Sequence, residues 1–170
     1  MNVIVSPHSS LGAVLDWGAG PRRCAIGRGG LGLKLAEGDG VTPLGTHPIR
    51  RGFYRADRLP RPNTSLALTE IAPDDGWCDA PGDAAYNRPV KLPYRASAET
   101  LWREDALYDV IVVLGFNDDP VRDGKGSAIF LHLARPDYGP TEGCVALALS
   151  DMLELLAALT PGAVLTCLKD

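Results

Sequence analysis

The residues best suited to chemistry in this chain are a histidine and a cysteine near its C-terminal end. His132 lies near the end of an apolar run, residues 128–133, and Cys144 follows after eleven intervening residues. Alternation within this run predicts a buried strand with Ala128, Phe130 and His132 on one face. The intervening residues are rich in Pro, Gly and Asp, which favour turns. We therefore expect the loop to double back and bring the imidazole and the thiol together.

A thiol paired with an imidazole is typical of nucleophilic catalysis. An ordinary thiol has a pKa near ~8.5, so an imidazole that takes its proton raises the reactive fraction at neutral pH. Gly143 directly precedes the cysteine, and its backbone can turn sharply and expose amides that bind an oxyanion. The carbonyl of Leu133 is a candidate to orient the imidazole, because no acidic residue is placed for that role. The alternative is a buried free cysteine beside a core histidine.

Several motifs surround this pair in a fixed order. They are Gly40 to Thr46, Phe130-Leu131-His132, Thr141-Glu142-Gly143-Cys144-Val145, Ser150-Asp151 and Pro161-Gly162. Over residues 25–168 the chain resembles the YkuD-type L,D-transpeptidases, which remodel the bacterial cell wall. Two short segments differ from that family. It usually has Ser-His-Gly-Cys where this chain has Thr141-Glu142-Gly143-Cys144, and Arg or Asn soon after the cysteine where this chain has Ala146.

The resemblance implies a cysteine acyltransferase acting on peptidoglycan stem peptides. His132 would deprotonate Cys144, the thiolate would attack a donor carbonyl, and an amine of a second stem would resolve the acyl-enzyme. A compact branch of the family is associated with 1,3-type cross-links that join L-Ala to meso-diaminopimelate. Two alternatives stay open: hydrolysis by an L,D-carboxypeptidase or endopeptidase, and a non-catalytic cell-wall binding module with the same fold.

Substrate-binding groups are sought around the same loop and in a long irregular segment. Arg135 is a candidate clamp for a stem carboxylate, because a guanidinium binds carboxylates bidentately; a solvated loop arginine is the alternative. Arg28, in a Gly-rich connection, is a second candidate carboxylate binder, and Thr141 lies beside the Gly-Cys pair. Tyr86 and Asn87 belong to residues 55–93, and loops of that length are usually functional. Packing of this loop onto the sheet is the alternative.

Composition predicts one mainly β domain over residues 1–170. With 45% apolar residues the chain can bury a sizeable core, and its 19 glycines and 14 prolines indicate many turns between short strands. We expect a twisted β-sandwich or partly closed barrel, with short helices at residues 97–107 and 150–159, the second capped by Ser150. Strands are expected at residues 1–6, 13–17, 23–27, 46–54, 66–71, 108–116, 128–133, 145–149 and 163–168.

Charge and cysteine usage exclude several classes. The net charge of −4 without a basic run argues against a nucleic-acid surface. The four cysteines contain no CxxC pair, so we expect no metal site and no cofactor, although a Cys24–Cys167 bridge is compatible with an oxidising compartment. The chain shows no membrane span and no secretory signal. The resemblance nevertheless implies a periplasmic or cell-envelope protein, for which we expect a monomer.

Overall fold

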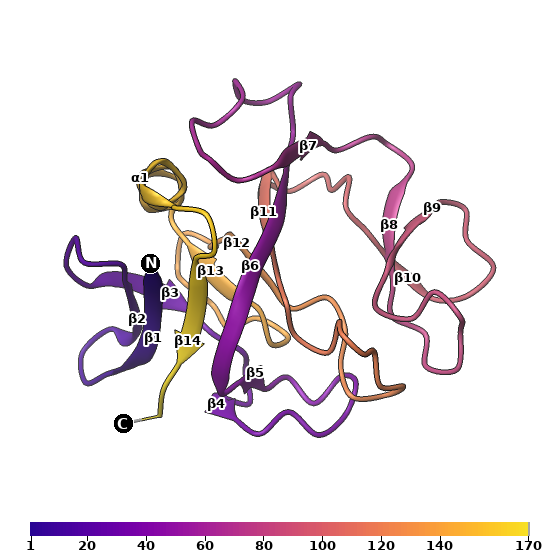
Figure 1. The fold of residues 1–170 in the computed structure, drawn as a ribbon, viewed down its shortest axis with the longest axis horizontal. Helices are drawn as coiled ribbons and strands as arrows, with labels where there is room; N and C mark the ends of the chain where they lie inside the picture. Colours follow the sequence, from indigo (N-terminus) through magenta and orange to yellow (C-terminus); the bar gives the residue numbers. More distant parts are fainter. Residues whose placement is uncertain (170) are drawn as a thin grey trace.

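The computed structural model describes residues 1–169, and within them it is mainly β with one helix (Figure 1). The helix, α1, spans Leu149–Ala158. The strands, in chain order, are β1 (Asn2–His8), β2 (Gly12–Asp16), β3 (Arg22–Ala25), β4 (Leu31–Gly32), β5 (Thr42–Pro43), β6 (Gly45–Tyr54), β7 (Leu68–Glu70), β8 (Asp75–Cys78), β9 (Pro89–Lys91), β10 (Ala98–Thr100), β11 (Val110–Leu114), β12 (Phe130–Leu133), β13 (Val145–Leu147) and β14 (Val164–Cys167).

The main sheet closes on itself. Its order is β11-β12-β13-β3-β2-β1-β14-β6, and β6 pairs back onto β11, while β7 pairs with β6 outside this ring. The first and last strands, β1 and β14, are parallel neighbours within the ring. The partly closed barrel expected from the sequence is therefore closed, which leaves none of these eight strands with a free edge.

Alternation along the strands divides the apolar residues between two cores. On β11, Val110 and Val112 belong to the cluster inside the barrel, whereas Ile111 and Val113 belong to a second cluster outside it. The outer cluster is covered by the segment between β7 and β11, which includes the small antiparallel sheet β10-β8-β9 beside the barrel (Figure 1). The long irregular segment thus forms a second layer over one part of the barrel wall.

Most expected strands are present, with boundaries within a few residues. The prediction of a helix at residues 97–107 is wrong. Ala98–Thr100 forms strand β10, which pairs with β8, and turns follow this strand. Local helix signals there are overridden by tertiary pairing, which offers the backbone a full set of partners. The second helix is confirmed, but it begins one residue early: Ala148 is its N-cap and Ser150 does not cap it.

Candidate active site

The strands that carry the histidine and the cysteine are parallel neighbours in the barrel wall. His132 on β12 is paired with Ala146 on β13, and Cys144 lies two residues before Ala146. Side chains two apart in extended chain share a face, so the imidazole and the thiol both point outward, toward the second layer. Both line one cleft of about 500 Å³ between the barrel and that layer.

The thiol of Cys144 is held by the backbone of the neighbouring strand segment. Its Sγ accepts a hydrogen bond from the Phe130 amide at 3.3 Å and donates one to the Ala128 carbonyl at 3.2 Å. Ala128 has a φ of 52°, an unusual value for a residue with a Cβ. Its amide donates to Asn87 Oδ1 at 3.1 Å. Asn87 therefore holds the backbone that in turn holds the thiol.

The imidazole of His132 is fixed in one tautomer. Its Nδ1 lies 2.9 Å from the Leu133 carbonyl oxygen, which can only accept, so Nδ1 carries the proton and Nε2 keeps its lone pair. The ring of Tyr108 packs against it edge-on, with centroids 5.2 Å apart. The Tyr108 hydroxyl donates to Glu99, which also faces the cleft. The available nitrogen, Nε2, is the one that a general base needs.

Burial keeps both groups neutral. Desolvation lowers the pKa of His132 to about 4, with Arg103 and Arg135 contributing in the same direction against the Leu133 hydrogen bond. Burial also raises the pKa of Cys144 to about 12, and the nearby Glu99 adds to this. Near neutral pH the pair is therefore a thiol and a neutral imidazole.

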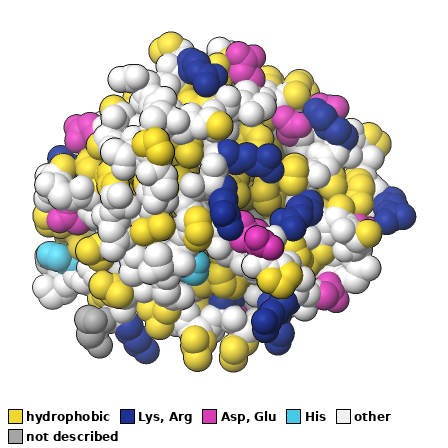
Figure 2. Space-filling model, viewed as in Figure 1, with side chains coloured by type: hydrophobic (Ala, Val, Ile, Leu, Met, Phe, Trp, Pro, Cys, Tyr) yellow, Lys and Arg dark blue, Asp and Glu magenta, His cyan; other side chains and the backbone are white. Residues whose placement is uncertain are grey.

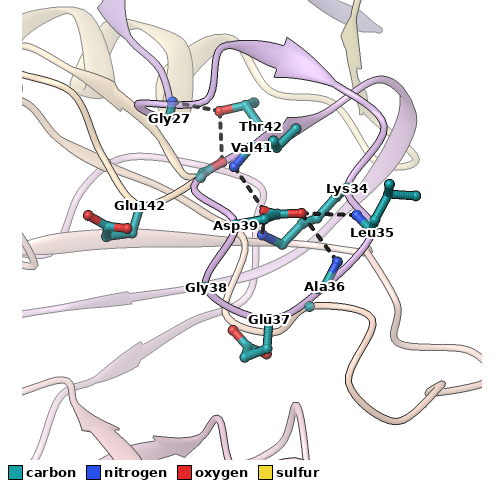
Figure 3. Close-up of polar contacts among 12 residues, drawn as sticks. Gly27, Lys34, Leu35, Ala36, Glu37, Gly38, Asp39, Val41, Thr42 and Glu142 are labelled. Atoms are coloured by element: carbon teal, nitrogen blue, oxygen red, sulfur yellow. Dashed lines mark hydrogen bonds and ion pairs between the residues drawn. The ribbon is translucent and has the colours of Figure 1, made fainter.

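The turn before Cys144 is built around Gly143. Its φ is 133°, and a Cβ there would lie 2.9 Å from the Val41 carbonyl oxygen. Thr42 Oγ1 donates to the Gly143 carbonyl at 2.9 Å and accepts from the Gly27 amide at 2.8 Å (Figure 3). The Gly143 amide donates to Thr141 Oγ1 at 3.2 Å. Because that amide is already engaged, the Cys144 amide is the better candidate donor to an oxyanion.

Charged side chains of both signs line the cleft. The acidic ones are Glu37, Asp79, Glu99 and Glu142, and the basic ones are Lys34, Arg103 and Arg135. Asp79 Oδ1 is buried and has no hydrogen-bond partner within residues 1–169. Six of the lining residues were not predicted from the sequence to lie at the site: Lys34, Glu37, Asp79, Glu99, Arg103 and Tyr108. They come from loops and from the second layer, and local sequence patterns carry no signal for their approach.

The substrate-binding candidates are placed unequally. Arg135 lines the cleft and is exposed, with its Nη1 donating to the Pro140 carbonyl at 3.2 Å. Thr141 also lines the cleft, but its hydroxyl donates to the Cys144 carbonyl at 2.6 Å. Arg28 is not among the lining residues, and its Nε is paired with Glu142 at 2.9 Å. Of the two arginine candidates, only Arg135 lines the cleft.

Tyr86 and Asn87 do not line this cleft. Tyr86 is 3% exposed, and its hydroxyl donates to Glu37 at 2.5 Å. Asn87 is equally buried and lines a separate hollow of about 300 Å³ with Arg50, Arg51 and Arg88. Lys and Arg side chains gather near the middle of the face that β6 crosses (Figure 2). Tyr86 and Asn87 are thus buried behind the cleft wall, as expected from the alternative in which this segment packs onto the sheet.

Comparison with known proteins agrees with this geometry. A family model, the L,D-transpeptidase catalytic domain YkuD, matches residues 5–166. The match covers nearly the whole chain, so the chain belongs to the YkuD family of L,D-transpeptidase catalytic domains. A search of the curated proteins finds no match.

Three further observations describe what residues 1–169 contain. All four cysteines are free and buried, including Cys24 and Cys167. No group of three or more His, Cys, Asp and Glu side chains is arranged to hold a metal ion in this part of the chain. None of its helices has the length and apolar character needed to cross a membrane.

Proposed function

We propose that the chain is an L,D-transpeptidase that cross-links peptidoglycan stem peptides through an acyl-enzyme on Cys144. One observation carries the proposal: in a chain of this family, the thiol of Cys144 and the imidazole of His132 face the same cleft. Peptidoglycan lies in the cell envelope, which is where the protein would act. The 1,3-type link between L-Ala and meso-diaminopimelate is the cross-link that we propose, following the family branch that lacks the His before Gly-Cys.

The site chemistry follows from the observed tautomer. His132 Nε2 takes the proton of Cys144 as sulfur attacks the donor carbonyl, forming a C–S bond and placing negative charge on the carbonyl oxygen. The Cys144 amide stabilises that oxygen. Collapse expels the donor's leaving amine, which takes the proton from His132. The acceptor amine then attacks the thioester and gives a proton to His132. A C–N bond forms, the C–S bond breaks, and the leaving sulfur takes that proton back from His132, which restores the thiol.

Charge in the cleft supports an amine as the acceptor. Glu37, Asp79 and Glu99 face the same space as the nucleophile. These carboxylates offer hydrogen-bond acceptors to an ammonium group. Arg135, which carries the opposite charge, is available to a stem carboxylate. A substrate with both groups, such as a stem that contains diaminopimelate, suits this distribution.

The test is product analysis with purified muropeptides. Wild-type protein is expected to release the donor's C-terminal part and to form cross-linked dimers, which mass spectrometry distinguishes by their linkage. Cys144→Ala and His132→Ala should each lose nearly all turnover and keep a thermal midpoint within a few degrees. Shortened monomers without dimers would instead establish hydrolysis. Binding to the cell wall without any product, and without a covalent β-lactam adduct on Cys144, would leave the binding module.

A further inference from the structure

The loop between β4 and β5 places a buried ammonium group against the nucleophile turn. Lys34 has a side chain that is 2% exposed, and it lines the same cleft as Cys144. Its Nζ lies 3.6 Å from the position that a Cβ would take on Gly143. A Cβ on Gly126 would lie 2.4 Å from Lys34 Cε, so the absence of a side chain at Gly126 makes room for the lysine stem. The ammonium is therefore held by packing against the turn that precedes Cys144, in the cleft that the thiol also lines.

Asp39 binds Lys34, but its carboxylate is also stabilised by the backbone of its own loop. The Asp39 carboxylate accepts hydrogen bonds from the backbone amides of Leu35 at 2.9 Å, Ala36 at 3.2 Å and Val41 at 3.0 Å (Figure 3). Lys34 Nζ adds a contact of 2.7 Å. Because three backbone amides already stabilise the Asp39 carboxylate, the loop does not need Lys34 to compensate that negative charge. Within residues 1–169, Asp39 takes one of the three N–H donors of Lys34, which leaves others for the cleft.

We propose that Lys34 is a further functional residue of this site, whose ammonium stabilises the negative charge that forms on Cys144 Sγ and on the attacked carbonyl oxygen. The lysine keeps its own protons throughout; the proton of the thiol passes to His132. A positive charge fixed in a poorly solvated cleft lowers the cost of the anion far more than the same charge in water. Lys34 also lowers the pKa of Cys144, against the larger effects of burial and of Glu99.

Other charged and titratable groups line the same cleft, and they stay unchanged in every variant compared. They are Glu37, Asp79, Glu99 and Glu142 on the acidic side, Arg103 and Arg135 on the basic side, and the neutral His132 and Tyr108. The inference rests on the proposed function only for the role of Lys34 at the carbonyl oxygen. Its role at the sulfur can be measured with a simple alkylating agent, whether or not the protein turns over peptidoglycan.

The experiment follows the rate of Cys144 alkylation by iodoacetamide from pH 6 to 10, read by peptide mass spectrometry. Lys34→Met should slow alkylation at pH 8 about tenfold, equivalent to a rise of about one unit in the thiol pKa. Lys34→Arg should restore most of the rate. Lys125→Met removes an exposed lysine from a neighbouring loop and is the matched control, for which no change is expected.

Lys34→Gln separates the charge of the lysine from its hydrogen bond to the loop, because a glutamine amide is neutral and can still donate to Asp39. If Lys34 acts by charge, Lys34→Gln should slow alkylation as Lys34→Met does. If Lys34 merely ties the loop down, Lys34→Gln should alkylate at the wild-type rate, and that result overturns the inference. Wild-type rates in Lys34→Met overturn it as well. Should Lys34→Met not fold, Lys34→Gln decides alone. Failure of wild-type protein to turn over muropeptides would overturn the proposed function and leave the alkylation result standing.

Discussion

At the level of single residues, the neutral state of His132 couples the site to stability. The imidazole is 6% exposed, and its pKa is about 4 in the folded protein against an ordinary value of 6.5. Below pH 6.5 the unfolded chain binds a proton at this position that the folded protein does not. Stability must therefore fall as the pH falls from about 6.5 toward 4.

His132→Asn should remove this part of the pH dependence. For wild type we expect a loss of about 2 kcal/mol in the free energy of unfolding between pH 7.5 and pH 5 from this residue. Asn can still donate to the Leu133 carbonyl but does not titrate. Chemical denaturation at several pH values measures the difference between the two proteins, in which contributions shared by both, such as the raised pKa of Glu99, cancel. Parallel pH profiles for the two proteins would contradict the prediction.

At the level of elements, one hydroxyl group joins three segments around Cys144. Thr42 on β5 connects the Gly27 amide, which follows β3, to the Gly143 carbonyl, which precedes β13. The threonine is 1% exposed, so its partners have no water to replace it. Buried polar groups that lose a partner cost free energy because their desolvation is no longer offset.

Thr42→Val keeps the shape and removes the hydroxyl. We expect a loss of about 1–3 kcal/mol in the free energy of unfolding, together with a clear drop in turnover, because the turn that presents Cys144 loses its anchor. Thr46→Val is the matched control: it removes a similar hydroxyl contact, 3.0 Å to Thr166, from an exposed position. Equal effects of the two substitutions on stability and turnover would show that Thr42 has no special role.

The elements also show how far local sequence patterns reach. Alternation within residues 128–133 predicted which side chains share a face of β12, because period two is a property of the strand itself. That this face points outward came only from the structure. The spacing of His132 and Cys144 predicted that they lie close together, because the two residues stand at the two ends of one short connection. Lys34 and Glu99 approach the same thiol from distant segments, and their approach depends on barrel closure and on the second layer. The helix expected at residues 97–107 failed for the same reason, since β8 is the partner that decides its conformation.

At the level of the whole molecule, the closing strand should dominate stability. β14 pairs with β1 on one side and with β6 on the other, and its Leu165 is fully buried in the inner core. Leu165→Ala should cost about 2–5 kcal/mol through lost contacts and a residual cavity. Leu168→Ala, at a position 41% exposed, is the control and should change stability little. Thermal and chemical unfolding measure the loss of stability in both variants. A small effect of Leu165→Ala would contradict the prediction that β14 dominates the stability of the barrel.

The parallel pairing of β1 with β14 has a consequence for how the chain folds. Asn2 is matched with Val164 and Val5 with Cys167, so these contacts join residues that are almost the full length of the chain apart. Contacts at such separation require closure of a very long loop before they give any stabilisation, which slows folding. A chain still being synthesised cannot complete the ring until β14 has emerged, so β1 and β6 lack this shared neighbour until synthesis has passed the last strand.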